Sequence, residues 1–405
     1  MNKPHCPILD ELSVIWNQKL SERYGEGYFL INEAVGRLKL IAERFYALGL
    51  NDNHFTKEIL SKIPYKYEQR MSEILFSDRL IRDGYKLSSG KKGPDFKAEK
   101  NGKITWFEVI TPQPVPKLVE QFNNPSYSLN PTHEGTQLAT HSTLLKTTAA
   151  IEAKHHKIKG YINEGIISET DKAVIVINDS LFFPLDRRTI GLNCEVANGC
   201  SGLPLVAEGL LGIGQSYFTD IHKDNNFQIV RSKNETITNQ NNSQVDTNRF
   251  ETDFYSDISG VFVLTLREDY GLAEVVYEHE KNKKNKGVFL INPNTTRPFE
   301  TGGLSAKYLD FKKLDNLTSA STTNPVRQIV TPTLWGYFME FNRYISYIKQ
   351  LYIEAGVFVI DEETDEVSLS EKAFEVGIER YVLIYDESTG IPKGVSLTEE
   401  WYFIR

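Results

Sequence analysis

Cysteine, long apolar runs and excess positive charge are scarce or missing in this sequence of 405 residues. The three cysteines, Cys6, Cys194 and Cys200, are odd in number and lack the close pairing of a zinc ribbon, which indicates a reducing compartment. No run approaches the roughly 18 apolar residues that a membrane span requires, and the first residues lack an apolar signal core. We therefore expect a cytoplasmic protein with no membrane-spanning segment.

The net charge of −8 argues against a protein that coats nucleic acid with its whole surface. Local contact remains open, because lysines gather along one stretch, at Lys91, Lys92, Lys97, Lys100 and Lys103. Such a cluster is more often a solvated surface than a phosphate site. The overall composition, 40% hydrophobic and 25% charged, is typical of a globular protein.

An aspartate in a turn and a glutamate in an apolar strand lie close together in this same stretch. Asp95 belongs to Gly93-Pro94-Asp95-Phe96, and Glu108 lies inside the apolar run 104–112. Between them, Asn101-Gly102 is typical of a tight hairpin turn. A hairpin would bring the two acids onto neighbouring strands, close enough to share a cation. The alternative is an ordinary turn aspartate and a strand glutamate whose charge is compensated by a salt bridge.

A helix is predicted over residues 67–82, and it carries an acid at the border of its apolar face. Glu73 has Phe76 and Leu80 three and seven residues further on. It could point into a site or reach solvent. Glu68 occupies a comparable position and competes with it.

A second helix, predicted over residues 142–164, carries a lysine beside its apolar seam. Lys154 lies some 40–60° from that seam on a helix of about 3.6 residues per turn, whereas Lys157 is expected to point farther away. A lysine in this position is often a surface residue whose stem covers the core edge. It could also deliver its ammonium to a site on the sheet.

The other elements predict a mixed α/β protein. Residues 8–19 and 32–48 read as helices, and the continuous apolar run 173–178 is typical of a strand buried on both faces. Strand, helix and strand in this order give a crossover unit. Further strands are expected at 258–266 and 287–292, exposed loops at 112–131 and 234–248, a buried close-packed segment at 203–218, and an aromatic helix at 335–354. We expect an N-terminal helical region at 1–62, a core at 63–300 and a C-terminal accessory α+β region at 301–405.

Taken together, these residues resemble the restriction-endonuclease-like superfamily, whose core is an αβββαβ unit with the motif PD…(D/E)xK. The closer resemblance is to an uncharacterised bacterial group with GPDF and W(I)E(A)VAP-like motifs. The matching segments are Gly93–Phe96, Trp106–Pro112, Lys154, Ile177-Asn178 and Asn292-Pro293. The resemblance covers roughly residues 65–300.

The resemblance implies a nuclease that uses Mg²⁺ or Mn²⁺ to hydrolyse phosphodiester bonds, most naturally in DNA. It implies Asp95, Glu108 and Glu73 as metal ligands, the carbonyl of residue 109 as another, and Lys154 as the catalytic lysine. Lys91, Lys92 and Lys97 would contact the nucleic acid.

One departure from the superfamily pattern matters. The lysine expected two residues after the strand acid is replaced by Ile110. Either the lysine has moved to another element, with Lys154 as the candidate, or the site has decayed. The alternatives to a nuclease are therefore a nucleic-acid or protein-binding module on a decayed nuclease fold, and a structural protein whose helical ends mediate assembly.

Overall fold

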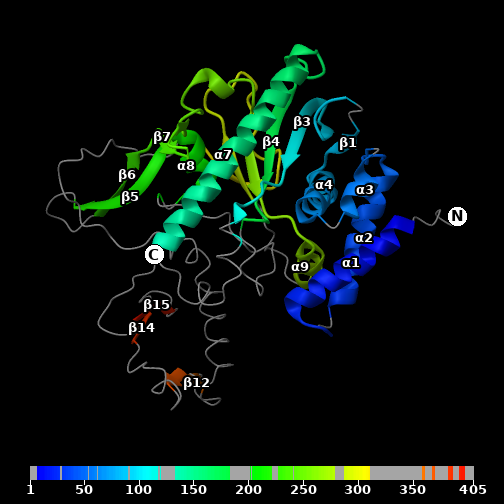
Figure 1. Cartoon of the computed structure of the whole chain (residues 1–405), viewed down its shortest axis with the longest axis horizontal. Coiled ribbons are helices and arrows are strands. Elements are labelled where there is room, and N and C mark those ends of the chain that lie inside the picture. Colours follow the sequence, from blue (N-terminus) through cyan, green and yellow to red (C-terminus); the bar gives the residue numbers. More distant parts are fainter. Residues whose placement is uncertain are drawn as a thin grey trace. The chain divides into compact units, whose positions relative to one another are not determined.

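A seven-stranded sheet lies at the centre of the computed structural model, in the order β1-β2-β3-β4-β9-β10-β11 (Figure 1). The strands are β1 (Lys86–Ser88), β2 (Phe96–Lys100), β3 (Lys103–Ile110), β4 (Lys172–Asn178), β9 (Gly260–Leu264), β10 (Val288–Ile291) and β11 (Lys307–Leu309). The first three form an antiparallel meander, β3, β4 and β9 run parallel, β10 is antiparallel to β9, and β11 is parallel to β10. The mixed sheet predicted from the sequence is confirmed.

The structure describes residues 7–310, apart from 28–29, 53, 62, 90–91, 117–118, 120–132, 183–200, 202, 221–226, 240 and 279–286. Beyond residue 310 it describes β12 (Phe358–Ile360) paired with β13 (Val367–Leu369), and β14 (Val382–Tyr385) paired with β15 (Pro392–Ser396). Lys91, the three cysteines, most of the loop expected at 112–131 and the helix expected at 335–354 lie outside these residues.

The chain separates into two compact units, Met1–Thr331 and Pro332–Arg405. This division differs from the boundaries expected near residues 62 and 300. The last strand of the central sheet, β11, lies beyond residue 300, and the N-terminal helices share the core of the sheet rather than forming a core of their own.

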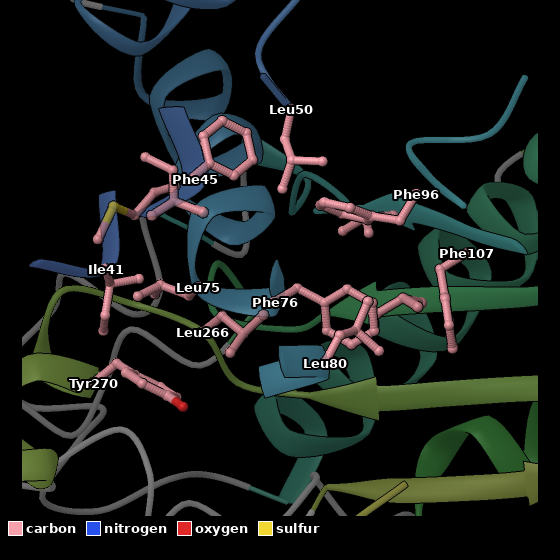
Figure 2. Packing of buried hydrophobic residues seen from close by; sticks show 14 of the residues in the cluster. Ile41, Phe45, Leu50, Leu75, Phe76, Leu80, Phe96, Phe107, Leu266 and Tyr270 are labelled. Carbon is pink, nitrogen blue, oxygen red and sulfur yellow. The ribbon is translucent and has the colours of Figure 1, made fainter. Parts of the chain in front are cut away.

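One face of the sheet is covered by α1 (Pro7–Tyr24), α2 (Ile31–Ala47), α3 (Phe55–Ile59), α4 (Pro64–Arg82) and α9 (Asp269–Glu278). In Figure 2, Phe76 of α4 points toward the strands, with its ring centroid 5.9 Å from that of Phe96 and 5.4 Å from that of Phe107. Leu12 and Trp16 of α1 belong to the same buried cluster. Helix α4 therefore connects the N-terminal helices to the sheet.

The opposite face is covered by α7 (His133–Asn163) and α8 (Leu205–Leu211), which Figure 1 shows on the other side of the strands from α1–α4. Successive side chains of a strand alternate between faces. Accordingly, Phe107 and Val109 of β3 pack toward α4, whereas Trp106 packs with Ile151 and Ile158 of α7. Glu108 follows the parity of Trp106, so its side chain belongs to the α7 face.

The Asn-rich segment 234–248, expected as an exposed loop, contains a short hairpin. β7 (Thr236–Thr238) pairs with β8 (Gln244–Asp246), and the Asn239 side chain caps the turn by accepting hydrogen bonds from the backbone amides of Asn241 and Ser243. Local side-chain capping of this kind is how asparagine organises turns. The preceding hairpin joins β5 (Ile213–Asp220) to β6 (Phe227–Lys233). None of the helices in the described ranges is long and apolar enough to cross a membrane.

Candidate functional site

Tight backbone geometry on both sides of β2 positions Asp95. At one end, Asn101 (φ 53°) and Gly102 (φ 72°) make the predicted two-residue turn that pairs Lys100 with Lys103. At the other end, Gly93 has φ 139°, and a Cβ there would lie 3.0 Å from the Ile166 side chain. The glycine of the Gly-Pro-Asp-Phe motif is therefore required by close packing of the turn that carries Asp95.

The hairpin brings Asp95 beside Glu108, as predicted. Phe96 pairs with Phe107, so Asp95 enters β2 opposite Glu108 on β3. Its Oδ2 accepts a hydrogen bond of 2.7 Å from the backbone amide of Val109. Glu108 is only 2% exposed. Two acidic side chains therefore lie together on the α7 face of the sheet.

Lys154 of α7 reaches this pair, which confirms the position predicted for its ammonium. Its Nζ lies 2.6 Å from Glu108 Oε1, and the residue is buried. Lys157 points farther out, as expected, with a side chain that is 58% exposed, yet its Nζ still lies 3.4 Å from the same oxygen. The angle around the helix gives the direction of the Lys157 backbone position, but the flexible four-carbon side chain can still bring the ammonium back to Glu108.

Glu73 of α4 approaches from the other face and is already held by two side chains. Gln69 Nε2 donates to its Oε1 at 3.0 Å, and Arg70 lies 2.9 Å from its Oε2. Gln69 Nε2 also donates to the carbonyl of Val109 at 3.2 Å, and its Oε1 accepts from the amide of Thr111 at 2.8 Å. One glutamine thus joins Glu73 to the end of β3.

Burial and mutual repulsion dominate the electrostatics of the site. Burial, and next the charge of Glu108, raise the pKa of Asp95 to about 8, although Lys154 and the Val109 amide oppose the shift. Burial also raises the pKa of Glu73, against the effect of Arg70. Burial alone would lower the pKa of Lys154, but the charges of Asp95 and Glu108 outweigh it and raise the pKa. The site is therefore a cluster of acidic side chains whose ionisation is opposed by burial and mutual repulsion, together with a lysine that stays protonated.

Several other charged residues belong elsewhere. Glu68, the competitor of Glu73, pairs with Lys19 at 3.1 Å, and Glu268 lies 3.3 Å from the same ammonium. Lys97 lies over the Trp106 ring, with Nζ 5.2 Å from its centroid. Lys92 is exposed, with no contact to the carboxylates among those described.

Two residues of the lysine stretch, Lys100 and Lys103, have structural partners. Lys100 donates to the carbonyl of Gly303 at 2.9 Å, and Lys103 pairs with Glu300. These contacts favour a structural role for both lysines rather than a phosphate site.

The two asparagine motifs hold the fold together. Asn178, at the end of β4, donates to the Leu266 carbonyl at 3.1 Å and to Thr111 Oγ1 at 3.3 Å, which fastens three chain segments at one edge of the sheet. Asn292 donates to the carbonyls of Tyr255 and Ile258. None of these contacts joins either amide to the acidic cluster.

Gln69, Arg70, Lys157 and Tyr161 are site residues that the sequence analysis did not identify. The pKa of Tyr161 is raised by burial and then by the charges of Glu108 and Asp95, so this tyrosine lies within electrostatic range of the pair. A signal was present on α7, because Lys154, Lys157 and Tyr161 follow the i, i+3, i+7 spacing of one helix face.

The donor set suits a hard divalent cation, which prefers carboxylate and carbonyl oxygens. The pKa of Asp95 is raised first by desolvation and next by the charge of Glu108, and a bound cation would offset both effects. Asp95 and Glu108 could hold it directly, whereas Glu73 would have to exchange a hydrogen bond or act through water. Within the described residues, no group of three or more His, Cys, Asp or Glu side chains is arranged as a metal site.

Comparisons with protein-family models, with curated proteins and with solved structures find no match to this chain.

Proposed function

We propose that the central sheet with α4 and α7 forms a restriction-endonuclease-like core and that the protein is a nuclease that cleaves DNA with Mg²⁺ or Mn²⁺. The element order α4, β1, β2, β3, α7, β4 supports this, because it reproduces the αβββαβ order of that superfamily. The single observation that carries the proposal is the contact between Lys154 and Glu108 beside Asp95. Lys154 thus provides from α7 the ammonium group that the superfamily motif has on the strand, at the position of Ile110 in β3.

The residues present match the demands of phosphodiester hydrolysis. A bound Mg²⁺ or Mn²⁺ would activate water and neutralise phosphate charge. Asp95 and Glu108 would hold the ion, with Glu73 beside them. Lys154, fixed by its ion pair, would orient the attacking water and stabilise the negative charge that grows in the transition state. Gln69 and Arg70 would hold Glu73 in place.

The test is cleavage of supercoiled plasmid, linear duplex, single-stranded DNA and RNA with Mg²⁺, Mn²⁺ or EDTA. We expect cleavage of DNA that requires the metal. Lys154→Met should lower the rate about 10²-fold or more, the size of effect seen when one preorganised charge is removed. Its metal affinity, measured as a metal-dependent rise in Tm, should barely change, because lysine is not a ligand.

Lys159→Met is the matched control, because Lys159 is an exposed lysine of the same helix whose Nζ lies 5.9 Å from the Phe254 ring centroid. It should cleave at the parental rate. Loss of the Lys154 ion pair will also lower stability, so rates are compared well below the Tm of the variant. Absence of metal-dependent cleavage for every substrate would refute the nuclease, and full activity of Lys154→Met would refute the catalytic role of Lys154.

A nucleic-acid or protein-binding module on a decayed nuclease fold is the second candidate, and Ile110 is the observation that favours it. Such a module would bind nucleic acid or a protein with no turnover and would gain no thermal stability from Mg²⁺. The cleavage and Tm measurements therefore separate the two functions.

A further inference from the structure

Lys157 is an exposed cation at the edge of the acidic pair, and the hydrolysis proposed above leaves it without a role. Its Nζ shares Glu108 Oε1 with Lys154, at 3.4 Å against 2.6 Å. The two ammoniums differ sharply in environment, because the Lys157 side chain is 58% exposed and that of Lys154 is 10% exposed. Two lysines of one helix therefore meet one carboxylate from the solvent side and from the buried side.

Lys154, Lys157 and Tyr161 share one face of α7, on which Lys154 is buried, Lys157 is exposed and Tyr161 is half-buried. An anion that arrives from solvent can touch Lys157 without displacing other side chains, whereas Lys154 is covered. An exposed ion pair is weak and easily exchanged, because water screens it. A buried ion pair is costly to break, because its partner is left charged in a poorly solvated place. Lys157 can therefore leave Glu108, and Lys154 cannot do so readily.

Other described cations near the pair are committed elsewhere. Arg70 lies 2.7 Å from Glu58 and 2.9 Å from Glu73, and it also pairs with Asp52. Lys97 lies over the Trp106 ring. Among the cations that the structure describes in contact with Glu108, only Lys157 is both directed at the site and open to solvent.

We propose that Lys157 is the substrate-anion contact of this site, and that it exchanges Glu108 for a phosphate of the DNA backbone when substrate binds. The inference rests on the proposed nuclease function. The two lysines then have different roles: Lys157 binds the substrate, and Lys154 serves the chemical step. A phosphate accepts an ammonium as a point charge, so no particular base sequence is required at this contact.

The test measures the affinity of the full chain for a short fluorescent DNA duplex across a series of KCl concentrations. Ca²⁺ replaces Mg²⁺, because it takes carboxylate ligands, and the duplex is checked for integrity afterwards. Lys157→Ala should weaken binding several-fold and flatten the slope of log affinity against log salt by about 0.9, the value for one lost phosphate contact. Lys157→Arg should restore both, because arginine also binds phosphate.

Lys159→Ala removes the same charge from an exposed position of the same helix and should leave the slope unchanged. Single-turnover cleavage at saturating DNA completes the comparison: Lys157→Ala should retain the parental rate, whereas Lys154→Met should lose it. If Lys157→Ala and Lys159→Ala weaken binding equally, the effect is general electrostatics and the contact is refuted. An unchanged affinity of Lys157→Ala with a lower single-turnover rate would also overturn it.

These outcomes separate the contact from the nuclease itself. A parent protein that cleaves DNA while Lys157→Ala binds normally keeps the nuclease and removes the contact. A parent protein that binds DNA without cleaving it, and loses affinity on Lys157→Ala, keeps the contact and removes the nuclease. A parent protein that neither binds nor cleaves DNA refutes both.

Discussion

Asp95 keeps its carboxyl group in an unfavourable place. It is half-buried, is desolvated and lies beside the charge of Glu108, and its favourable partners, the Val109 amide and Lys154, do not compensate fully, so its pKa rises to about 8. Functional sites often retain residues that lower the stability of the fold. The cost of ionising Asp95 in the folded protein is therefore consistent with a role in binding a cation rather than in stabilising the fold.

Asp95→Asn should abolish cleavage and raise the Tm of the protein in EDTA at pH 8.5. The amide keeps an oxygen that can accept from Val109, but it carries no charge to repel Glu108. Thermal melting and plasmid cleavage measure the two effects. Asp253→Asn, at an exposed aspartate, is the control and should change neither. Cleavage at the parental rate by Asp95→Asn would show that Asp95 is not a ligand.

At the residue scale, the positions of site residues could be predicted from the sequence where they depend on a local pattern such as a turn or a helical spacing. The Asn101-Gly102 turn fixes how Asp95 and Glu108 pair, and the helical spacing places Lys154. Gln69 could not be found in this way. Its partners, Val109 and Thr111, lie 40 and 42 residues away, and the contact depends on how α4 crosses the end of β3.

At the scale of elements, Gln69 fastens α4 to β3 by bonding two backbone groups and one carboxylate. Gln69→Leu should lower the free energy of unfolding by about 1–3 kcal/mol, because the Thr111 amide and the Val109 carbonyl lose a partner. Denaturant unfolding gives the stability, and faster hydrogen exchange at the Thr111 amide gives the location. Gln18→Leu, at an exposed glutamine bonded only within α1 in the described contacts, should cost little. Equal losses for the two variants would contradict the fastening role.

Helix α8 carries a buried acid that should make stability depend on pH. Burial raises the pKa of Glu208 to about 7, although its Oε1 accepts from the Ser201 amide at 2.7 Å. The folded state then holds a proton that the unfolded state releases near pH 4.5, so this residue lowers stability progressively as pH rises from about 4.5 to 7. Glu208→Gln should remove that part of the decline.

Urea unfolding at pH 5 and pH 8 measures the difference. The gain in stability from Glu208→Gln should be larger at pH 8. Glu164→Gln, at an exposed glutamate after α7, should give the same small change at both values. A gain for Glu208→Gln that is independent of pH would refute the buried-acid explanation.

Among elements, long periodic segments were predicted well and short ones were not. Helices α2 and α4 and strand β4 carry continuous apolar patterns that define them. The Asn-rich hairpin β7–β8 was predicted as a loop, because its pairing depends on the Asn239 cap and on Ile237 finding a buried place. Composition alone does not reveal either contact.

At the scale of the first compact unit, the N-terminal helices are part of one core with the sheet. Trp16 of α1 is fully buried in the cluster that contains Phe76 of α4 and Val174 of β4. The sequence predicted these helices but not their docking, since an amphipathic helix does not specify which surface it covers. The unit should therefore unfold as a whole rather than shed these helices first.

Trp16→Ala should lower the stability of that whole unit by about 3–5 kcal/mol, the usual cost of removing a large buried aromatic side chain. Circular dichroism and tryptophan fluorescence should show a single coincident transition at lower denaturant. Val14→Ala is the control on the same helix, because Val14 is 69% exposed. Early, separate loss of helical signal with the sheet intact would show that the N-terminal helices form an independent layer.

The 2.7 Å hydrogen bond from the Val109 amide to Asp95 gives the molecule an internal spectroscopic reporter. An amide proton that donates to a carboxylate is strongly deshielded, and its resonance responds when that carboxylate takes up a proton or a cation. The single Val109 cross-peak in an amide spectrum would therefore follow the charge state of Asp95 directly. Titrations with acid and with metal could be read at the same nucleus, in the intact protein and with no substrate present.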